Sequence, residues 1–133
     1  ELLAGGADGV PKVYRMIRQK ARRIGDDFNL IRAYGAMPGR LFSVAYNKDG
    51  SKLVAGSSLN NRGEVRVYQA DDGKQLTRIE FKQGGIFAVA FHPSADQIAA
   101  GGFDGFINLV NVKDGKTVAR FYPVPLSPET AKK

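Results

Sequence analysis

The sequence predicts an all-β protein made of repeated four-stranded antiparallel units. Three observations predict this class. Segments of similar sequence return every 42 to 45 residues along the 133-residue chain. Within each segment, large apolar side chains alternate with small or polar ones, which is the period-two pattern of a β-strand. Short turn sequences rich in Gly, Asn and Asp separate these runs.

The repeat is clearest in two copies that share three matching segments. The first two segments return 45 residues later and the third returns 42 residues later: 42–46 as 87–91, 53–56 as 98–101, and 63–68 as 105–110. The change of step places three extra residues in the earlier copy, between Gly56 and Gly63. An incomplete copy opens the chain, because residues 2–9 (LLAGGADG) parallel residues 98–105 (IAAGGFDG).

The first strand of each full copy is the most apolar one. Residues 42–46 (FSVAY) and 87–91 (FAVAF) place large apolar side chains at alternate positions, with Ser or Ala between them. Because the intervening side chains are small rather than charged, we expect both faces of this strand to be buried. Tight-turn sequences follow, at 47–50 (NKDG) and 92–95 (HPSA).

The last strand of each copy is expected to form a wetter outer edge. It covers residues 75–81 in one copy and 117–121 in the next, and it carries Arg78 or Arg120. Near the start of the chain, Val13 and Tyr14 stand in register with third strands, which favours a hairpin there. The competing interpretation is an apolar helix stripe formed by Val13, Met16, Ile17, Ala21 and Ile24.

Four-stranded units at this spacing, with an x-A-G-G-x-D-G turn before the third strand, resemble the blades of WD-repeat β-propellers. The resemblance covers about residues 2–122. The turn Asp of the family is kept as Asp8 and Asp104. The Trp-Asp pair that ends the family's third strand is replaced by Tyr14-Arg15, Tyr68-Gln69 and Val110-Asn111. The family's Gly-His pair before the first strand is absent too, with residues 37–39 (MPG) and 83–85 (QGG) in its place, so the family's His–Asp network cannot form here, whereas the blade plan can.

The resemblance implies a division of the chain into blades. Residues 1–34 hold the last three strands of one blade, with a basic hairpin insertion near 15–27, and residues 35–81 and 82–122 are full blades. Residues 123–133 are a proline-rich exit linker. Because propellers have at least four blades, these roughly 2.75 blades indicate an incomplete propeller. The missing blades would come from the rest of a longer polypeptide or from self-association.

The resemblance further implies a non-enzymatic scaffold for protein–protein interaction. Propellers bind partners across the face formed by the second-to-third-strand turns and the blade connections. The residues at these positions are Arg40, Leu59, Asn60, Asn61, Arg62, Lys82 and Phe103. Exposed apolar side chains beside Arg suit a binding rim, and Phe103 could equally cover the neighbouring blade. Asp8 and Asp104 are expected to hold their turns by accepting backbone N–H bonds.

An alternative function follows from the charge. The chain has 20 Lys and Arg against 13 Asp and Glu, a net charge of +7, and residues 10–34 contribute seven basic and two acidic residues to it. The basic patch consists of Arg15, Arg18, Lys20, Arg22 and Arg23. It would bind an anionic surface or nucleic acid, or it is a solvated hairpin tip. Nucleic acid is the weaker version, because no aromatic side chain interrupts the run.

Catalytic and metal-binding signals are absent from the sequence. There is no cysteine, and the only histidine, His92, lies in a turn with no acid or nucleophile placed beside it by a motif. We therefore expect no enzyme, no cofactor and no metal site. No apolar run approaches the roughly 20 residues of a transmembrane helix.

A third functional interpretation comes from the degenerate form of the repeats. They are similar to repeats in large bacterial multidomain proteins, where propellers sit beside haem-bearing, cytochrome-like modules. The chain would then be an accessory propeller of a redox protein. The absence of cysteine is compatible with cytoplasm or periplasm, and this similarity favours the periplasm slightly.

Overall fold

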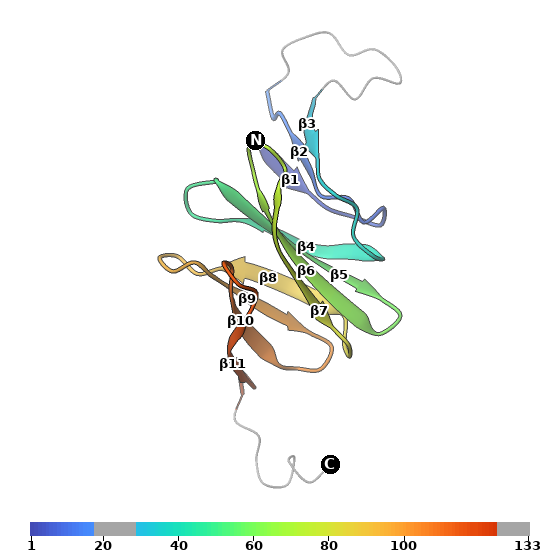
Figure 1. The fold of residues 1–133 in the computed structure, drawn as a ribbon. Coiled ribbons are helices and arrows are strands. Elements are labelled where there is room, and N and C mark those ends of the chain that lie inside the picture. The colour runs from blue at the N-terminus through green and yellow to red at the C-terminus, as the bar shows by residue number, and fades with distance from the viewer. Residues whose placement is uncertain (18–28, 125–133) are drawn as a thin grey trace, which may run out of the picture.

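The computed structural model describes residues 1–17 and 29–124, and this part of the chain contains eleven β-strands and no helix. The strands form three antiparallel sheets, called first, second and third in chain order (Figure 1). The first sheet consists of β1 (Leu2–Ala4), β2 (Lys12–Tyr14) and β3 (Leu30–Ala33). The second consists of β4 (Arg40–Tyr46), β5 (Lys52–Leu59), β6 (Arg62–Gln69) and β7 (Gln75–Phe81). The third consists of β8 (Ile86–Phe91), β9 (Gln97–Gly102), β10 (Ile107–Asn111) and β11 (Thr117–Phe121).

Within each sheet the strands lie side by side in chain order, so each one pairs with its neighbour in the sequence. This confirms the all-β class. The expected fourth strands form as β7 and β11 with the expected bounds. Residues 12–14 are a strand, not the start of a helix. Figure 1 shows the three sheets stacked one after another from the blue N-terminal part to the orange C-terminal part.

The largest core lies between the second and third sheets. Val54, Val65 and Val67 of the second sheet are 0% exposed and pack in one cluster with apolar side chains of the third. The other members come from the third sheet and from the residue that follows β10: Ile86, Val89, Ile98, Ala100, Val110 and Val112. Side chains of a strand alternate between its two faces, and this alternation turns these residues toward one another. Burial of apolar surface at this interface is therefore what holds the two sheets together.

The core between the first and second sheets is built around two tyrosines. Tyr34 and Tyr68 are buried beside Val13 and Leu53, and their ring centroids lie 5.4 Å apart. The Tyr34 hydroxyl donates a hydrogen bond to the carbonyl oxygen of residue 70 at 2.7 Å. The Tyr68 hydroxyl donates one to the carbonyl oxygen of residue 35 at 2.9 Å. Both rings can thus be buried without leaving a hydroxyl unsatisfied.

The expectation that both faces of the first strands are buried is wrong at Phe42 and Phe87. Their side chains are 52% and 43% exposed. The pairing of β4 with β5 shifts register at Phe42, and the pairing of β8 with β9 shifts at Phe87. A β-bulge re-aims the side chain of the extra residue. The two rings meet each other edge to face instead, with centroids 5.0 Å apart.

The face of the third sheet that is turned away from the second is apolar and only partly buried. By the repeat register, Ile107 and Leu109 correspond to Val65 and Val67, which the third sheet covers completely. No sheet among the described residues covers Ile107 and Leu109. Phe121, which pairs with Ile107, is 44% exposed.

Two predicted segments lie largely outside the described residues. The basic insertion near 15–27 is described only to residue 17, and the proline-rich segment 123–133 only to residue 124.

Replacing Tyr68 with Phe tests the link between the first two sheets. Loss of the hydrogen bond to the carbonyl of residue 35 should lower the free energy of unfolding by about 1 kcal/mol at pH 7. Burial raises the pKa of the Tyr68 phenol above its ordinary 10.0. Stability from the neutral phenol is therefore fully present below pH 10 and is lost as the pH rises through the folded-state pKa. The difference between wild type and Y68F should shrink above pH 10.

Urea unfolding of both proteins between pH 7 and pH 11 measures this difference. Tyr122, whose side chain is 42% exposed, supplies the control variant Y122F. An exposed hydroxyl should change stability by no more than about 0.5 kcal/mol. Equal pH dependence of Y68F and wild type would contradict the proposed role of burial.

Candidate functional site

The predicted partner-binding residues lie at one end of the sheets, called here the hairpin end. It consists of the β5–β6 turn (59–62), the β9–β10 turn (102–105) and the connection between β7 and β8 (82–85). The connection joins the two turns through hydrogen bonds: the Gly84 N–H donates to the Asn61 carbonyl at 2.8 Å, and the Phe103 N–H donates to the Gly85 carbonyl at 3.0 Å. Arg40 belongs to the same end, because it pairs with Ser58 in the β4–β5 ladder.

The β5–β6 turn is a two-residue hairpin. Leu59 pairs with Arg62, and the two residues between them, Asn60 and Asn61, have φ angles of 50° and 60°. Positive φ at both central residues defines a type I′ turn, and Asn tolerates this region better than other residues with a side chain. The turn places Leu59 and Arg62 side by side, and both are exposed.

Apolar side chains are exposed at this end. Phe103 is 75% exposed and Leu59 is 46% exposed. The ring of Phe103 therefore does not pack against a neighbouring sheet. The edge-to-face pair of Phe42 and Phe87 lies at the same ends of β4 and β8. The sequence pattern predicted that Phe42 and Phe87 are buried, because regular alternation along a strand does not account for a bulge. The recurrence of Phe at the same position of both copies was the available signal.

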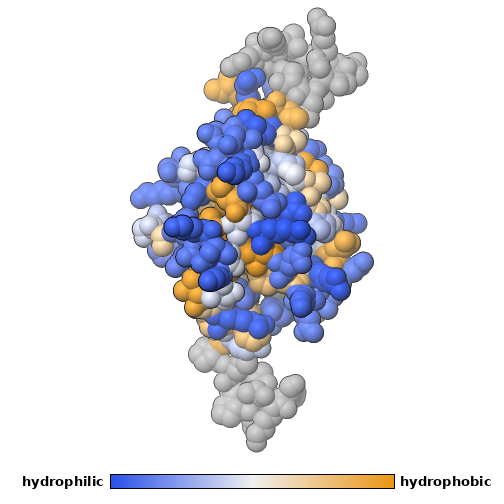
Figure 2. All heavy atoms as spheres, in the orientation of Figure 1, coloured by the Kyte–Doolittle hydropathy of each residue, from blue (hydrophilic) through white to orange (hydrophobic). Residues whose placement is uncertain are grey.

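On the face of the molecule drawn in Figure 2, hydrophilic side chains separate the hydrophobic ones. The hydrophobic areas on this face are small. Recognition on such a surface depends on individual apolar side chains beside charged ones rather than on one large apolar patch.

A groove of about 530 Å³ opens beside the β5–β6 turn. It contains three of the predicted residues, Leu59, Arg62 and Lys82. The other residues that line it are Pro38, Ser57, Gly63, Glu64, Arg78, Glu80 and Phe81. The strands β5, β6 and β7 form its floor, and Pro38 from the connection between the first and second sheets forms a wall.

The wall is held by a close backbone approach at Gly39. This residue has a φ of +76°, and a Cβ atom there would lie 2.1 Å from the Ser58 carbonyl oxygen. Any side chain would therefore push the connection away from β5. Glycine at this position allows Pro38 to stand beside the end of β5.

The charged floor of the groove was not predicted. The side chain of Glu64 is 7% exposed, and it accepts hydrogen bonds from Arg66 Nε and from Arg78 Nη2, the latter at 3.1 Å. Arg78 also pairs with Glu80. Arg66 donates a second bond to the carbonyl oxygen of residue 36 at 2.9 Å, which ties the floor to the connection. A buried carboxylate shared by two guanidinium groups is fully compensated.

Asp8 and Asp104 accept hydrogen bonds within their own turns. The Val10 N–H donates to Asp8 Oδ1 at 3.1 Å, and the Phe106 N–H donates to Asp104 Oδ1 at 3.1 Å. Hydrogen bonds from the Lys12 side chain and from the Val10 N–H lower the pKa of the Asp8 carboxyl below 3.8. Side-chain bonds of this kind hold tight turns.

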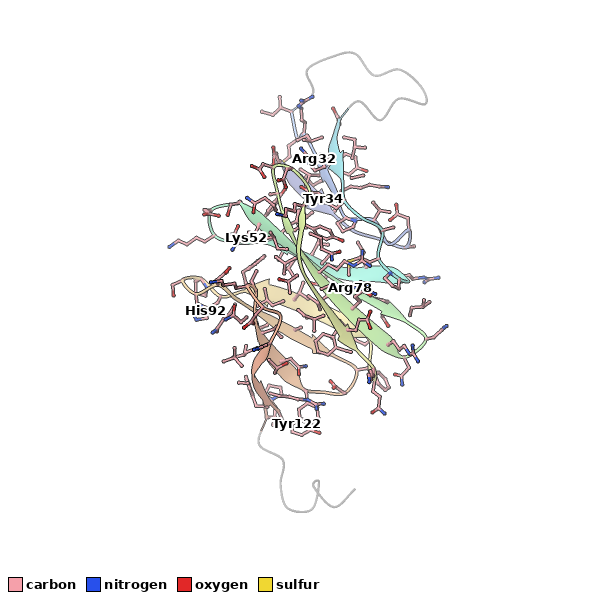
Figure 3. All side chains as sticks on the ribbon, viewed as in Figure 1. Arg32, Tyr34, Lys52, Arg78, His92 and Tyr122 are labelled. Atoms are coloured by element: carbon pink, nitrogen blue, oxygen red, sulfur yellow. The ribbon has the colours of Figure 1, made fainter. Side chains whose placement is uncertain are left out.

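His92 lies at the opposite end of the sheets. Its Nδ1 accepts N–H bonds from Ser94 at 3.1 Å and from Ala95 at 2.9 Å, so the ring closes its own turn. Figure 3 places His92 and Lys52 on one side of the view and Arg78 on the other. Lys52 bridges to Asp96 at 2.6 Å across the second and third sheets. Among residues 1–17 and 29–124, no group of three or more His, Cys, Asp or Glu side chains could hold a metal ion.

The basic patch is only partly described. Arg15 is exposed immediately after β2. Arg18, Lys20, Arg22 and Arg23 lie outside the described residues. In the part of the chain that the structure describes, no helix has the length and apolar character to cross a membrane.

Comparisons with known proteins agree with the repeat and the fold. Residues 73–111 match the family described as "WD domain, G-beta repeat". This segment comprises β7 of the second sheet and β8 to β10 of the third, so one repeat links two sheets. No curated protein matches the chain.

Among solved structures, the chain is similar to the computationally designed Ika8 protein, a designed propeller. The TM-score is 0.68 at 22% sequence identity, over 90% of this chain. The chain spans 32% of the length of the designed protein.

Substitutions at Asn61 separate the backbone of the β5–β6 turn from its side chain. Asn61→Ala should lower the free energy of unfolding by about 1 kcal/mol, because Ala resists positive φ. Asn61→Gly should leave it unchanged or raise it slightly, because Gly adopts positive φ without steric cost. Urea unfolding of the two variants and the wild type measures both effects. Equal losses in the two variants would show that the Asn side chain, and not the turn conformation, stabilises the hairpin.

Proposed function

From the WD40 repeat at residues 73–111 and the stack of antiparallel sheets that contains it, we propose that the chain is a non-enzymatic protein-interaction module. WD40 repeat domains are typically protein-interaction scaffolds. The binding surface is the hairpin end, where two hairpin turns and the connection between them are held in fixed positions. A rigid set of loops on a packed scaffold is the usual location of binding residues.

The observation that carries this proposal is the exposure of aromatic rings at the end of the sheets that also carries the exposed Arg40, Arg62 and Lys82. Phe103 is 75% exposed, and the Phe42–Phe87 pair is about half exposed. Exposure of an aromatic ring to water is unfavourable, so the free energy falls when a partner covers the ring. Aromatic and Arg side chains are also the residues that contribute most at protein interfaces.

The charge of the hairpin end indicates an acidic partner. Arg40, Arg62 and Lys82 are exposed, and none forms an ion pair with a described residue. The nearby carboxylates of Glu64 and Glu80 are already paired with Arg66 and Arg78. A partner surface that combines acidic side chains with apolar ones would complement this end.

Selection from a random peptide library on the immobilised chain, followed by calorimetry with the selected peptides, tests the proposal. Enriched peptides should combine apolar and acidic residues. Phe103→Ser and Phe87→Ser should each weaken their binding at least about 10-fold, because truncating a central interface ring costs 1.4 kcal/mol or more.

Val118→Ser is the matched control. Val118 is 56% exposed on β11, the outer edge of the third sheet, and its loss should leave binding unchanged. Absence of any enriched peptide, or binding that survives both Phe substitutions, would overturn the proposal.

A further inference from the structure

The second and third sheets differ in the side chains at a group of equivalent repeat positions. In the third sheet, the rings of Phe106 and Tyr122 stack with centroids 4.0 Å apart. The guanidinium of Arg120 lies over the Phe106 ring, 3.7 Å from its centroid. Arg120 also reaches Asp104 at 3.1 Å. The guanidinium of Arg120 and the two aromatic rings thus form one packed cluster on this sheet.

The equivalent residues of the second sheet, 42 positions earlier in the chain, lie on the floor of the groove. Glu64, Arg78 and Glu80 are the equivalents of Phe106, Arg120 and Tyr122, respectively. The strand registers agree, because Arg120 pairs with Asn108 and Arg78 pairs with Arg66, its equivalent. The second sheet therefore keeps the arginine and replaces both rings with carboxylates.

The replacement puts smaller side chains at these positions of the second sheet, beside the groove. Two aromatic rings occupy these positions in the third sheet, whereas the carboxylates of Glu64 and Glu80 are smaller and are drawn toward Arg66 and Arg78. The groove of about 530 Å³ lies over them. Leu59, Phe81 and Pro38 supply apolar surface around it.

We propose that this groove binds a peptide segment of a protein partner through an aromatic side chain, which is seated against Arg78 as Phe106 is seated against Arg120. An acidic residue next to that ring pairs with Arg62 or Lys82 at the groove's edge. The inference rests on the proposed function and specifies its partner: an aromatic residue flanked by carboxylates.

The charges at the groove favour a peptide with few carboxylates over a nucleic acid. Arg62 and Lys82 are exposed cations with no ion pair to a described residue. Glu64 and Glu80 lie on the floor and are paired with Arg66 and Arg78, so a continuous line of phosphates would find no unpaired cation there. One or two carboxylates beside an aromatic ring can reach the cations at the edge and avoid the floor.

The probe is a capped pentapeptide with phenylalanine at its centre, glutamate on both sides of it and serine at the two ends. Titrated into the ¹⁵N-labelled chain, it should shift the backbone amide signals of Gly63, Arg78 and Lys82 and leave that of Gly115, at the opposite end, in place. Alanine at the centre should weaken binding about 10-fold, because the stacked ring is lost. Glutamine in place of both glutamates should weaken it several-fold.

Variants of the chain place the binding in the groove. Glu80→Tyr restores the ring that the third sheet has at this position, on a side chain that is 64% exposed, and it should abolish binding. Lys82→Glu should weaken binding of the glutamate peptide and not of the glutamine peptide. Lys113→Glu makes the same charge change at an exposed residue of the opposite end and should have no effect.

The inference is overturned if the alanine peptide binds as well as the phenylalanine peptide, or if E80Y and K82E bind like the wild type. Tighter binding of single-stranded oligothymidylate at the same amides would also overturn it in favour of a nucleic acid. Phe103→Ser lies outside the groove and should leave this pentapeptide binding unchanged. If the pentapeptide binds but the library selection yields no peptide, the hairpin-end proposal fails and the groove proposal stands. If the library selection yields peptides but the pentapeptide does not bind, the groove proposal fails and the hairpin-end proposal stands.

Discussion

The burial of one sheet against the next is the interaction on which the rest of this structure depends. Val65 and Val67 are fully buried where the third sheet covers them, whereas their repeat equivalents Ile107 and Leu109 remain partly exposed on the face that no described sheet covers. At about 25 cal/mol per Å² of apolar surface, such interfaces are the main source of stability. A four-stranded sheet with two apolar faces needs a neighbour on each.

Stacking of the sheets also fixes what lies at their ends. The connection 82–85 hydrogen-bonds to Asn61 of one hairpin turn and to Phe103 of the next, so the turns of two sheets form one surface. The register shifts at Phe42 and Phe87 turn two rings outward. The sheets thus serve as the scaffold, and the side chains available to a partner come from turns, bulges and strand ends.

Much of the fold could be predicted from the sequence because strand patterning and turn chemistry are local. The repeat step of 42 to 45 residues and the alternation of apolar side chains predicted the bounds of β7 and β11 as they occur. The same alternation failed at Phe42, since a bulge adds a residue to one strand and breaks the period of two. A bulge depends on how two strands pair, which neither strand specifies alone.

For the candidate site, the sequence by itself determined which turns lie at one end of the sheets, and thereby placed Leu59, Arg62, Lys82 and Phe103 there. The tertiary structure alone decided that a groove opens beside them. Glu64 and Glu80 read as ordinary polar residues of alternating strands. Both line the groove. Their carboxylates are smaller than the rings of Phe106 and Tyr122 at the equivalent positions of the third sheet, and they are held by ion pairs with Arg66 and Arg78. The volume left between packed elements depends on every side chain around it, so no local pattern encodes it.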